Sequence, residues 1–196
     1  ADTFFFKGVN GRWKDILTPA ELDQYHSALK RNLTPAAIDW LTRTSKNHIR
    51  GQGAYGDWVS LGGGAKSEVI GTAYYEYVVR LMSEMAAAIG KAEESKTYAA
   101  LADKVRDKFQ KEFVKPDGTI LESSQTGFAL AFTMNLLPED VRSAAAKQFA
   151  EEVRKRDWHL GTGFIGTPRL LPGLQAAGLT DVAYKLLLQD TFPSWL

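Results

Sequence analysis

The chain of 196 residues contains no cysteine, only three histidines and no long apolar run. Without cysteine it can form no disulfide, no thiol nucleophile and no cysteine-ligated metal site. His26, His48 and His159 are widely spaced in the sequence. They match no metal-binding signature such as His-Glu-x-x-His. We therefore expect neither a metal site formed by neighbouring residues nor a cofactor.

Neither sign of charge dominates the sequence. There are 24 Lys and Arg residues against 23 Asp and Glu residues, which gives a formal net charge of +1. The two signs are interleaved, so no face is basic enough to predict nucleic-acid binding. No stretch approaches the ~18 to 20 apolar residues that cross a membrane, and Phe4-Phe5-Phe6 is too short for a signal peptide. We expect a soluble, cytoplasmic, globular protein without nucleic-acid or membrane partners.

Apolar residues recur at steps of three and four through most of the chain, which predicts helices. The expected helices span residues 19–31, 35–43, 66–89, 93–113, 124–136, 139–156, 168–177 and 181–190. Gly90 is the expected C-cap of the first long helix, and the Lys115-Pro116-Asp117-Gly118 sequence predicts a turn with glycine at positive φ. The pattern predicts an all-α fold with a small N-terminal hairpin followed by three helical hairpins.

Residues 42–64 interrupt this pattern with glycine, serine, asparagine and charged residues, which is typical of a loop. This loop is the natural boundary in the sequence. We therefore predict three parts: a helical segment at residues 1–41, the loop at residues 42–64, and the helical hairpins at residues 65–196.

Four motifs after this boundary resemble the bacterial α-L-rhamnosidase family. They are Tyr55-Gly56-Asp57-Trp58, Gln125-Thr126, Thr162-Gly163-Phe164-Ile165-Gly166-Thr167-Pro168 and Pro193-Ser194-Trp195-Leu196. The resemblance covers residues 48–196 and implies about half of an (α/α)6 barrel of six helical hairpins. A half ring leaves apolar edges open, so we expect a homodimer in which two half rings close on each other.

The resemblance also indicates which catalytic groups are absent. Glycoside hydrolysis uses two carboxyl groups that flank the scissile bond. In the family, the resemblance implies, the general acid lies upstream of this segment and the general base shortly after its last motif. Asp57, Glu68 and Glu76 are the remaining candidates for a residual acid or base role. The alternatives are a turn cap for Asp57 and solvated helix positions for the two glutamates.

Three residues are predicted to contact a sugar-like or other small-molecule substrate: Trp58, His159 and Arg169. Trp58 matches a family position that faces the substrate, and an indole stacks well on a sugar ring. Its alternative role is a packing anchor after a glycine-rich loop. His159 and Arg169 lie beside the third motif, where the family lines its cleft, although family members usually carry an aromatic residue at the position of Arg169.

The first segment, residues 4–41, resembles the C-terminal tail of a bacterial sulfotransferase. The resemblance rests on a phenylalanine-rich start, Lys7-Gly8 and Gly11-Arg12-Trp13-Lys14. It implies a weak phosphate-binding site at Lys7 and Gly8. The sulfotransferase α/β core is missing, so that activity is not expected. The two resemblances predict a join at residues 41–47, and hence a chimera of two gene fragments, natural or engineered.

The sequence leaves three functions open. The leading hypothesis is a hydrolase, glycosidase-like or promiscuous, with weak or repurposed activity in a cleft near Trp58. The second is a catalytically silent chimeric fold that self-associates. The third is a promiscuous metal-dependent hydrolase whose ligands are assembled at a dimer interface.

Overall fold

A computed structural model of the protein describes residues 18, 20, 35–51, 56–62 and 64–196. The chain divides into two compact units, Ala1–Trp40 and Leu41–Leu196. The first described helix is α3, Pro35–Arg43, which has the predicted bounds. Apart from residue 20, the helix expected at residues 19–31 lies outside the described residues, and so does the phosphate site expected at Lys7 and Gly8.

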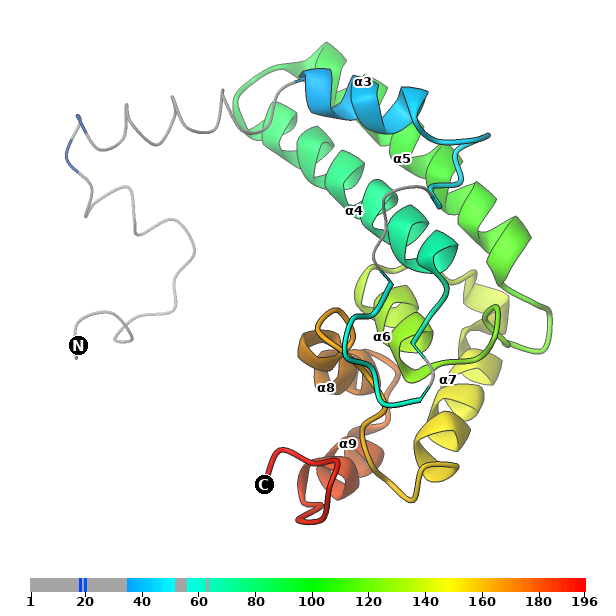
Figure 1. Ribbon diagram of the computed structural model, residues 1–196. Helices are drawn as coiled ribbons and strands as arrows, with labels where there is room; N and C mark the ends of the chain where they lie inside the picture. Colours follow the sequence, from blue (N-terminus) through cyan, green and yellow to red (C-terminus); the bar gives the residue numbers. More distant parts are fainter. Residues whose placement is uncertain (1–17, 19, 21–34, 52–55, 63) are drawn as a thin grey trace. The chain divides into compact units, whose positions relative to one another are not determined.

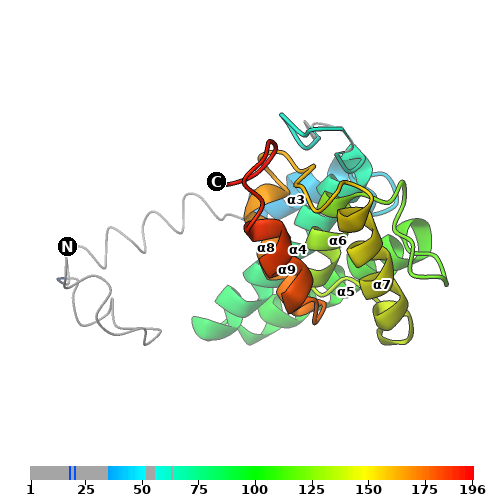
Figure 2. The ribbon, with the colours of Figure 1, turned by 90° about the horizontal axis from the view of Figure 1, so that it is seen from below.

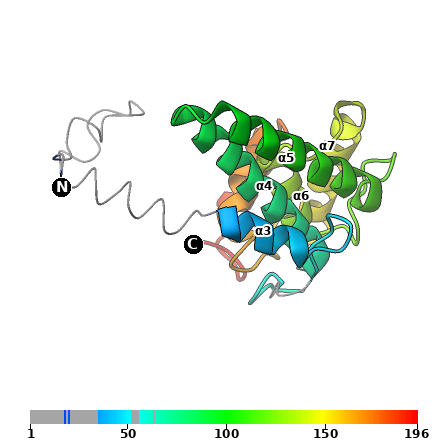
Figure 3. The same cartoon turned by 90° about the horizontal axis from the view of Figure 1, so that it is seen from above.

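Three helical hairpins follow in the second unit. They pair α4 (Ser67–Ala88) with α5 (Ala92–Phe113), α6 (Gln125–Thr133) with α7 (Glu139–Arg154), and α8 (Thr167–Ala176) with α9 (Thr180–Leu187). The helices α4 and α5 lie side by side as a long hairpin (Figures 1 and 3). The described residues contain isolated bridges but no named strand, so the prediction of an all-α fold is confirmed.

Local signals place the helix ends close to their predicted positions. Gly90 has a φ of +77° two residues after the end of α4, and its N–H donates to the Ala87 carbonyl at 3.0 Å, as expected for a glycine that ends a helix. Gly118 has a φ of +81° in the predicted turn. The helix α6 is shorter than predicted because the chain leaves helical geometry at Asn135, where φ is +53°.

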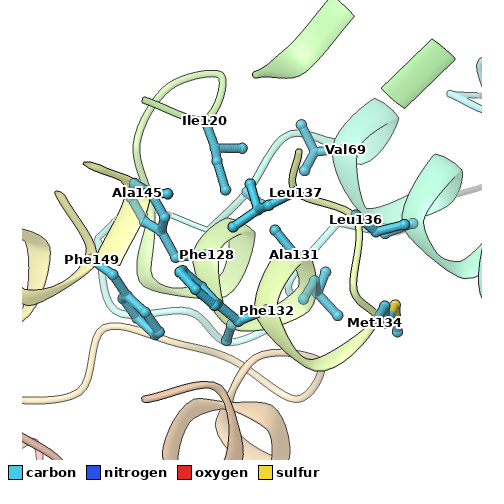
Figure 4. Close-up of a cluster of buried hydrophobic side chains, with 14 of the residues drawn as sticks. Val69, Ile120, Phe128, Ala131, Phe132, Met134, Leu136, Leu137, Ala145 and Phe149 are labelled. Carbon is cyan, nitrogen blue, oxygen red and sulfur yellow. The ribbon is translucent and has the colours of Figure 1, made fainter. Parts of the chain in front are cut away.

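The core forms around α6, which packs against α4, α7 and α8. Residues Gln125–Phe132 of this helix are all buried, so α6 has no solvent-facing stripe. Figures 1 and 2 both place α6 between α7 and α8. The rings of Phe128 and Phe132 stack on Phe149 of α7, with centroids 5.5 and 6.0 Å apart (Figure 4). Each buried phenylalanine stabilises the fold by about 1.5 to 3 kcal/mol.

Residues 44–50 pass directly over the start of α4. The N–H of Arg50 donates to the Thr72 hydroxyl at 3.0 Å. A Cβ atom at Gly71 would lie 2.2 Å from the Arg50 carbonyl oxygen, so glycine is required for this close approach. The segment predicted as a loop therefore packs on α4 here. None of the helices in the described ranges is both long enough and apolar enough to cross a bilayer.

Candidate functional site

Three loops meet where α4, α6 and α8 begin. They comprise residues 56–62, 121–124 and 159–166, and we call this region the loop end. Its central group is the Asp57 carboxylate, which is 6% exposed. One carboxylate oxygen, Oδ2, accepts hydrogen bonds from the Thr126 hydroxyl and, at 2.8 Å, from the Gly163 N–H. The other, Oδ1, accepts from the N–H groups of Ile165 and Gly166 at 2.9 and 3.1 Å.

These four bonds make Asp57 the group that joins the loop before α4 to α6 and to the loop before α8. A buried carboxylate is stable when several donors surround it, and backbone N–H groups supply three of the four donors here. This arrangement corresponds to a structural role for Asp57, which the sequence offered as a turn cap. It leaves the carboxylate engaged on both oxygens by the protein itself.

Further bonds fix the residues that follow Asp57. The Phe164 N–H donates to the Trp58 carbonyl at 2.9 Å, and the Leu61 N–H donates to the Gly161 carbonyl at 3.1 Å. The Arg156 guanidinium donates to the Leu61 carbonyl at 2.8 Å. Residues 58–61 are therefore held by the loop before α8 and by Arg156, two residues after α7.

Gln125 holds the loop before α8 from below. Its side chain is 2% exposed at the start of α6. The amide nitrogen donates to the His159 carbonyl at 2.9 Å, and the amide oxygen accepts from the Gly161 N–H at 2.7 Å. Because both the nitrogen and the oxygen of the amide are hydrogen-bonded to the loop, this side chain fixes the position of the loop relative to α6.

Backbone strain is concentrated around the loop end. Positive φ angles occur at Val59 (61°), Glu122 (59°), Ser123 (28°), Asp157 (50°) and Trp158 (64°). Positive φ is costly for residues with a side chain, and most of all for a β-branched residue such as Val59. Strain of this kind is typically found at functional sites, where the surrounding hydrogen bonds maintain it.

The most exposed feature of the loop end is an aromatic pair. The rings of Trp58 and Phe164 stack with centroids 5.3 Å apart and an interplanar angle of 19°. Trp58 is 70% exposed and Phe164 is 68% exposed. Two large aromatic side chains thus lie in solvent on a backbone that is fixed from below, so Trp58 is not a buried packing anchor.

Glu76 lies on α4 and is 2% exposed. Its Oε1 atom accepts from Arg80 at 3.0 and 2.7 Å, and Arg80 also donates to Asp103 of α5 at 3.0 Å. Burial raises the pKa of Glu76 above its ordinary value, and the hydrogen bond and charge of Arg80 partly oppose this effect. These contacts place Glu76 in the ion pairs that join the two long helices.

Glu68 is the remaining predicted carboxylate and lies in the first turn of α4. It is partly exposed, and its Oε2 atom accepts from the Ser67 hydroxyl at 3.3 Å. A Cβ atom on Gly51 would lie 2.9 Å from its Cγ atom. Of the three predicted carboxylates, Glu68 is the one with neither burial nor a cation contact in the described structure.

His159 and Arg169 are adjacent to the loop end, but their side chains have other contacts. The His159 Nδ1 atom lies 3.2 Å from the Arg156 carbonyl, which can only accept, so in the neutral ring Nδ1 carries the proton. Nε2 then accepts from the Thr191 hydroxyl at 2.8 Å. The Arg169 guanidinium lies over the ring of Tyr77 in α4, 5.4 Å from its centroid.

Sequence reasoning did not single out Phe164 or Glu122. Phe164 is the only aromatic residue of the third motif, between Gly163 and Gly166, and that context could have identified it. Glu122 pairs with Lys66 at 2.6 Å, and this hydrogen bond raises the pKa of Lys66. Within the described ranges, no three His, Asp or Glu side chains are grouped as metal ligands.

Comparison with known proteins shows similarity over most of the chain. Residues 23–196 match the family model of the bacterial alpha-L-rhamnosidase 6 hairpin glycosidase domain. An alpha-L-rhamnosidase of Streptomyces avermitilis is 41% identical over 160 residues, 82% of this chain and 15% of that protein. An alpha-L-rhamnosidase of Formosa agariphila is 35% identical over 203 residues, 95% of this chain and 22% of that protein.

A crystal structure of the Streptomyces avermitilis alpha-L-rhamnosidase complexed with L-rhamnose superposes with a TM-score of 0.77 at 40% identity. The match covers 81% of this chain and 15% of that one. The chain therefore spans less than a quarter of the length of these relatives. The three hairpins correspond to a fragment of the six-hairpin fold.

These similarities do not support the predicted chimera. The family match begins at residue 23 and the Formosa agariphila match covers 95% of the chain, so the likeness crosses the join predicted at residues 41–47. The sulfotransferase resemblance rested on a phenylalanine run, a Lys-Gly pair and the Gly11-Arg12-Trp13-Lys14 sequence. Such short motifs have low specificity because many unrelated loops contain them.

Proposed function

The chain belongs to the bacterial α-L-rhamnosidase six-hairpin glycosidase family, and on that premise we propose that its loop end binds a sugar ring as part of a glycosidase substrate site. The observation that carries this proposal is the exposed pair of Trp58 and Phe164 on a fixed backbone. The relatives' names indicate the candidate ligand, a terminal α-L-rhamnosyl residue.

The chemistry of the pair suits this ligand. A 6-deoxy sugar presents C–H groups and a methyl group on its apolar side, and these pack on an aromatic face. The ordering cost of binding is small because the hydrogen bonds around Asp57 already hold the Trp58 backbone in place. The Phe164 N–H and the Trp58 carbonyl are bonded to each other, so we expect the aromatic surface to supply most of the contact.

The first test is calorimetric titration of the chain with L-rhamnose and with methyl α-L-rhamnopyranoside. We expect affinities of about 1 mM or weaker, typical of a single ring on an open surface. The variants Trp58→Ala and Phe164→Ala should each weaken binding about three- to tenfold, the amount that an aromatic contact supplies. Phe192→Ala is the matched control, since Phe192 is 84% exposed and lies outside the loop end.

The proposal is refuted if Trp58→Ala binds both sugars as tightly as the unmodified chain. It is also refuted if Phe192→Ala weakens binding as much as Trp58→Ala, because the contact would then be non-specific. Circular dichroism of each variant shows whether the fold is retained, and both aromatic side chains at the loop end are exposed enough that their removal should leave it intact.

Weak hydrolysis near Trp58 stays a prediction, and Glu68 is the most accessible of the three carboxylates predicted for it. Asp57 and Glu76 are buried and already bonded to other protein groups. We propose that full activity requires the remainder of a longer domain, because glycoside hydrolysis needs two flanking carboxyl groups. Release of p-nitrophenol from its α-L-rhamnopyranoside, lost in Glu68→Gln, would support the weak activity, whereas equal rates in both proteins would refute Glu68 as its source.

We also propose that the chain self-associates through α8 and α9. A groove of about 420 Å³ lies on these helices, lined by Leu171, Pro172, Gln175, Thr180, Ala183, Tyr184 and Leu187. Beside it, Leu188 is 67% exposed, and an exposed apolar surface of this kind favours association. Light scattering should give a dimer mass that Leu188→Glu reduces to a monomer mass. A monomer at every concentration of the unmodified chain would refute the proposal.

A further inference from the structure

Arg156 lies two residues after α7, and its side chain contacts both of the loops that carry the aromatic pair. Its Nη1 atom donates to the Leu61 carbonyl at 2.8 Å. A Cβ atom at Gly161 would lie 2.7 to 2.9 Å from the Nε, Cζ and Cδ atoms of this arginine, and one at Gly62 would lie 3.4 Å from Nη1. The guanidinium therefore lies directly against two positions that carry no side chain.

The backbone of Arg156 gives this side chain a fixed starting point. Its N–H donates to the Val153 carbonyl at 3.2 Å, and its carbonyl accepts from the His159 N–H at 2.9 Å. Among the ion pairs between residues that the structure describes, this arginine takes part in none, and its charged group is bonded to the Leu61 carbonyl instead. A charged donor makes a stronger hydrogen bond than a neutral one, so this contact can hold a loop.

Two backbone hydrogen bonds connect the aromatic pair to the contacts of this arginine. The Phe164 N–H donates to the Trp58 carbonyl at 2.9 Å, and the Leu61 N–H donates to the Gly161 carbonyl at 3.1 Å. Leu61, whose carbonyl accepts from Arg156, follows Trp58 by three residues. The bond from the arginine therefore fixes the end of a short segment whose first residue carries the exposed indole.

This short segment is strained. Val59 has a φ of 61° and its side chain is 59% exposed. Positive φ is costly for a β-branched residue, and such a conformation persists only where the surrounding contacts maintain it. Because Val59 is mostly exposed, its own side chain contributes little to those contacts. Without the bond to the Leu61 carbonyl, residues 59–61 should relax toward negative φ and move Trp58 away from Phe164.

We propose that Arg156 is a positioning residue for the sugar site, whose hydrogen bond to Leu61 keeps Trp58 stacked on Phe164 in the conformation that receives the ligand. The arginine acts through the backbone of Leu61. A protein in which only a fraction of the molecules has the binding-competent conformation binds more weakly in proportion to that fraction. This inference rests on the proposed function for the identity of the ligand, and it adds a residue outside the four motifs that sets the affinity.

The first experiment reports the position of the aromatic pair without any ligand. Fluorine NMR of the chain labelled with 5-fluorotryptophan resolves the five tryptophans, and Trp58→Phe assigns one resonance. In Arg156→Ala, that resonance should move toward its position in Phe164→Ala, which has no ring to stack on. The Phe164 N–H should exchange about three- to tenfold faster, because the loops separate more often.

The second experiment measures the affinity for methyl α-L-rhamnopyranoside by NMR titration. Arg156→Ala should weaken binding about three- to tenfold, and Arg156→Lys should recover part of the loss, because an ammonium group can also donate to the Leu61 carbonyl. Arg142→Ala is the matched control, since Arg142 also donates to a backbone carbonyl of another helix, that of Ala176, at 3.4 Å. It should leave the fluorine resonance, the exchange and the affinity unchanged.

Gly161→Ala tests the same contact from the side of the loop. Its Cβ atom would lie within 2.9 Å of three side-chain atoms of Arg156, so the guanidinium would have to move away from Leu61. Gly161→Ala should therefore reproduce the effects of Arg156→Ala. The double variant should lose no more affinity than either single variant, because both substitutions remove one interaction. Losses that add in the double variant would overturn the assigned contact.

The outcomes distinguish this inference from the proposed function. If Arg156→Ala leaves the fluorine resonance and the exchange unchanged, the inference is overturned and the sugar site is still tested by Trp58→Ala. If the resonance and the exchange change but the affinity does not, the inference is overturned as well. If Arg156→Ala displaces Trp58 in a chain that binds no sugar, the positioning role is supported and the proposed function is refuted.

Discussion

Replacing Asp57 by asparagine should loosen the loop end and lower the stability of the second unit. The substitution keeps the shape of the side chain and changes one acceptor oxygen to an NH2 donor. Every recorded partner of the carboxylate is itself a donor: the hydroxyl of Thr126 and the N–H groups of Gly163, Ile165 and Gly166. In either orientation, the NH2 group of the asparagine therefore faces two protein groups that also donate.

The less costly orientation puts the NH2 group at the position of Oδ2. The Thr126 hydroxyl can then rotate and accept, but the buried Gly163 N–H loses its partner. An unsatisfied buried donor costs about 1 to 3 kcal/mol, and the remaining bonds weaken when their acceptor loses its charge. We estimate a total of about 3 kcal/mol for Asp57→Asn and about 5 kcal/mol for Asp57→Ala, which removes all four bonds.

Two measurements test this estimate. A thermal melt followed by circular dichroism should shift down by about 6 to 12 °C for Asp57→Asn, given about 2 to 4 °C per kcal/mol for a chain of this size. Hydrogen exchange should show faster exchange of the three N–H groups that donate to Asp57. Asp117→Asn is the control, since Asp117 accepts from the Thr119 N–H in an exposed turn.

A small effect would refute the reasoning. If Asp57→Asn melts within about 2 °C of the unmodified protein, the four hydrogen bonds do not hold the loop end as argued. Unchanged exchange of the Gly163 N–H would lead to the same conclusion, even if the melting temperature fell for another reason.

Other substitutions test the turns and the buried glutamate. Gly118→Ala should lower the free energy of unfolding by about 3 kcal/mol or more, because its Cβ atom would lie 2.2 Å from the Ala145 nitrogen at a φ of +81°. Gly90→Ala has open space at a φ of +77° and should lower it by about 1 kcal/mol. Similar urea midpoints for the two variants would contradict the steric argument. Val59→Asn should raise stability by about 1 kcal/mol, because asparagine tolerates the φ of 61° better and Val59 is 59% exposed; a lower melting temperature would show that the valine side chain contributes contacts instead. Burial raises the pKa of Glu76 above its ordinary value of 4.5, so its contribution to stability is complete below that value and is lost as the pH rises through the folded-state pKa. The melting temperature of the unmodified chain relative to Glu76→Gln should therefore fall as the pH rises above 4.5, and a rise would reverse the assigned sign.

Much of the fold could be predicted from local sequence patterns. The spacing of apolar residues predicts the long helices, because an amphipathic helix repeats every 3.6 residues whatever surrounds it. Gly90 and Gly118 end their elements through their own backbone freedom. The end of α6 was harder to predict from the sequence, because every residue from Gln125 to Phe132 is buried and no polar stripe marks where the helix ends.

The candidate site was only partly predictable. The sequence pointed to Trp58 through a motif, and the structure places it in an exposed stacked pair. The sequence did not show how the roles of Asp57, Glu68 and Glu76 differ. The burial and the hydrogen-bond partners of a carboxylate depend on residues far away in the chain. Asp57 and Gly166 are bonded across 109 positions of sequence, a distance that no local pattern can report.

The sequence by itself determined the helices, their turns and the family, because these depend on local periodicity, on glycine conformation and on ordered motifs. Only the tertiary structure decided what the polar and aromatic side chains do. The carboxylate of Asp57 is enclosed by donors from α6 and from the loop before α8, Glu76 is paired with Arg80, and the guanidinium of Arg169 lies over the ring of Tyr77. The reason is physical: the role of a charged group is set by its desolvation and its partners, and both are fixed by packing between segments distant in sequence.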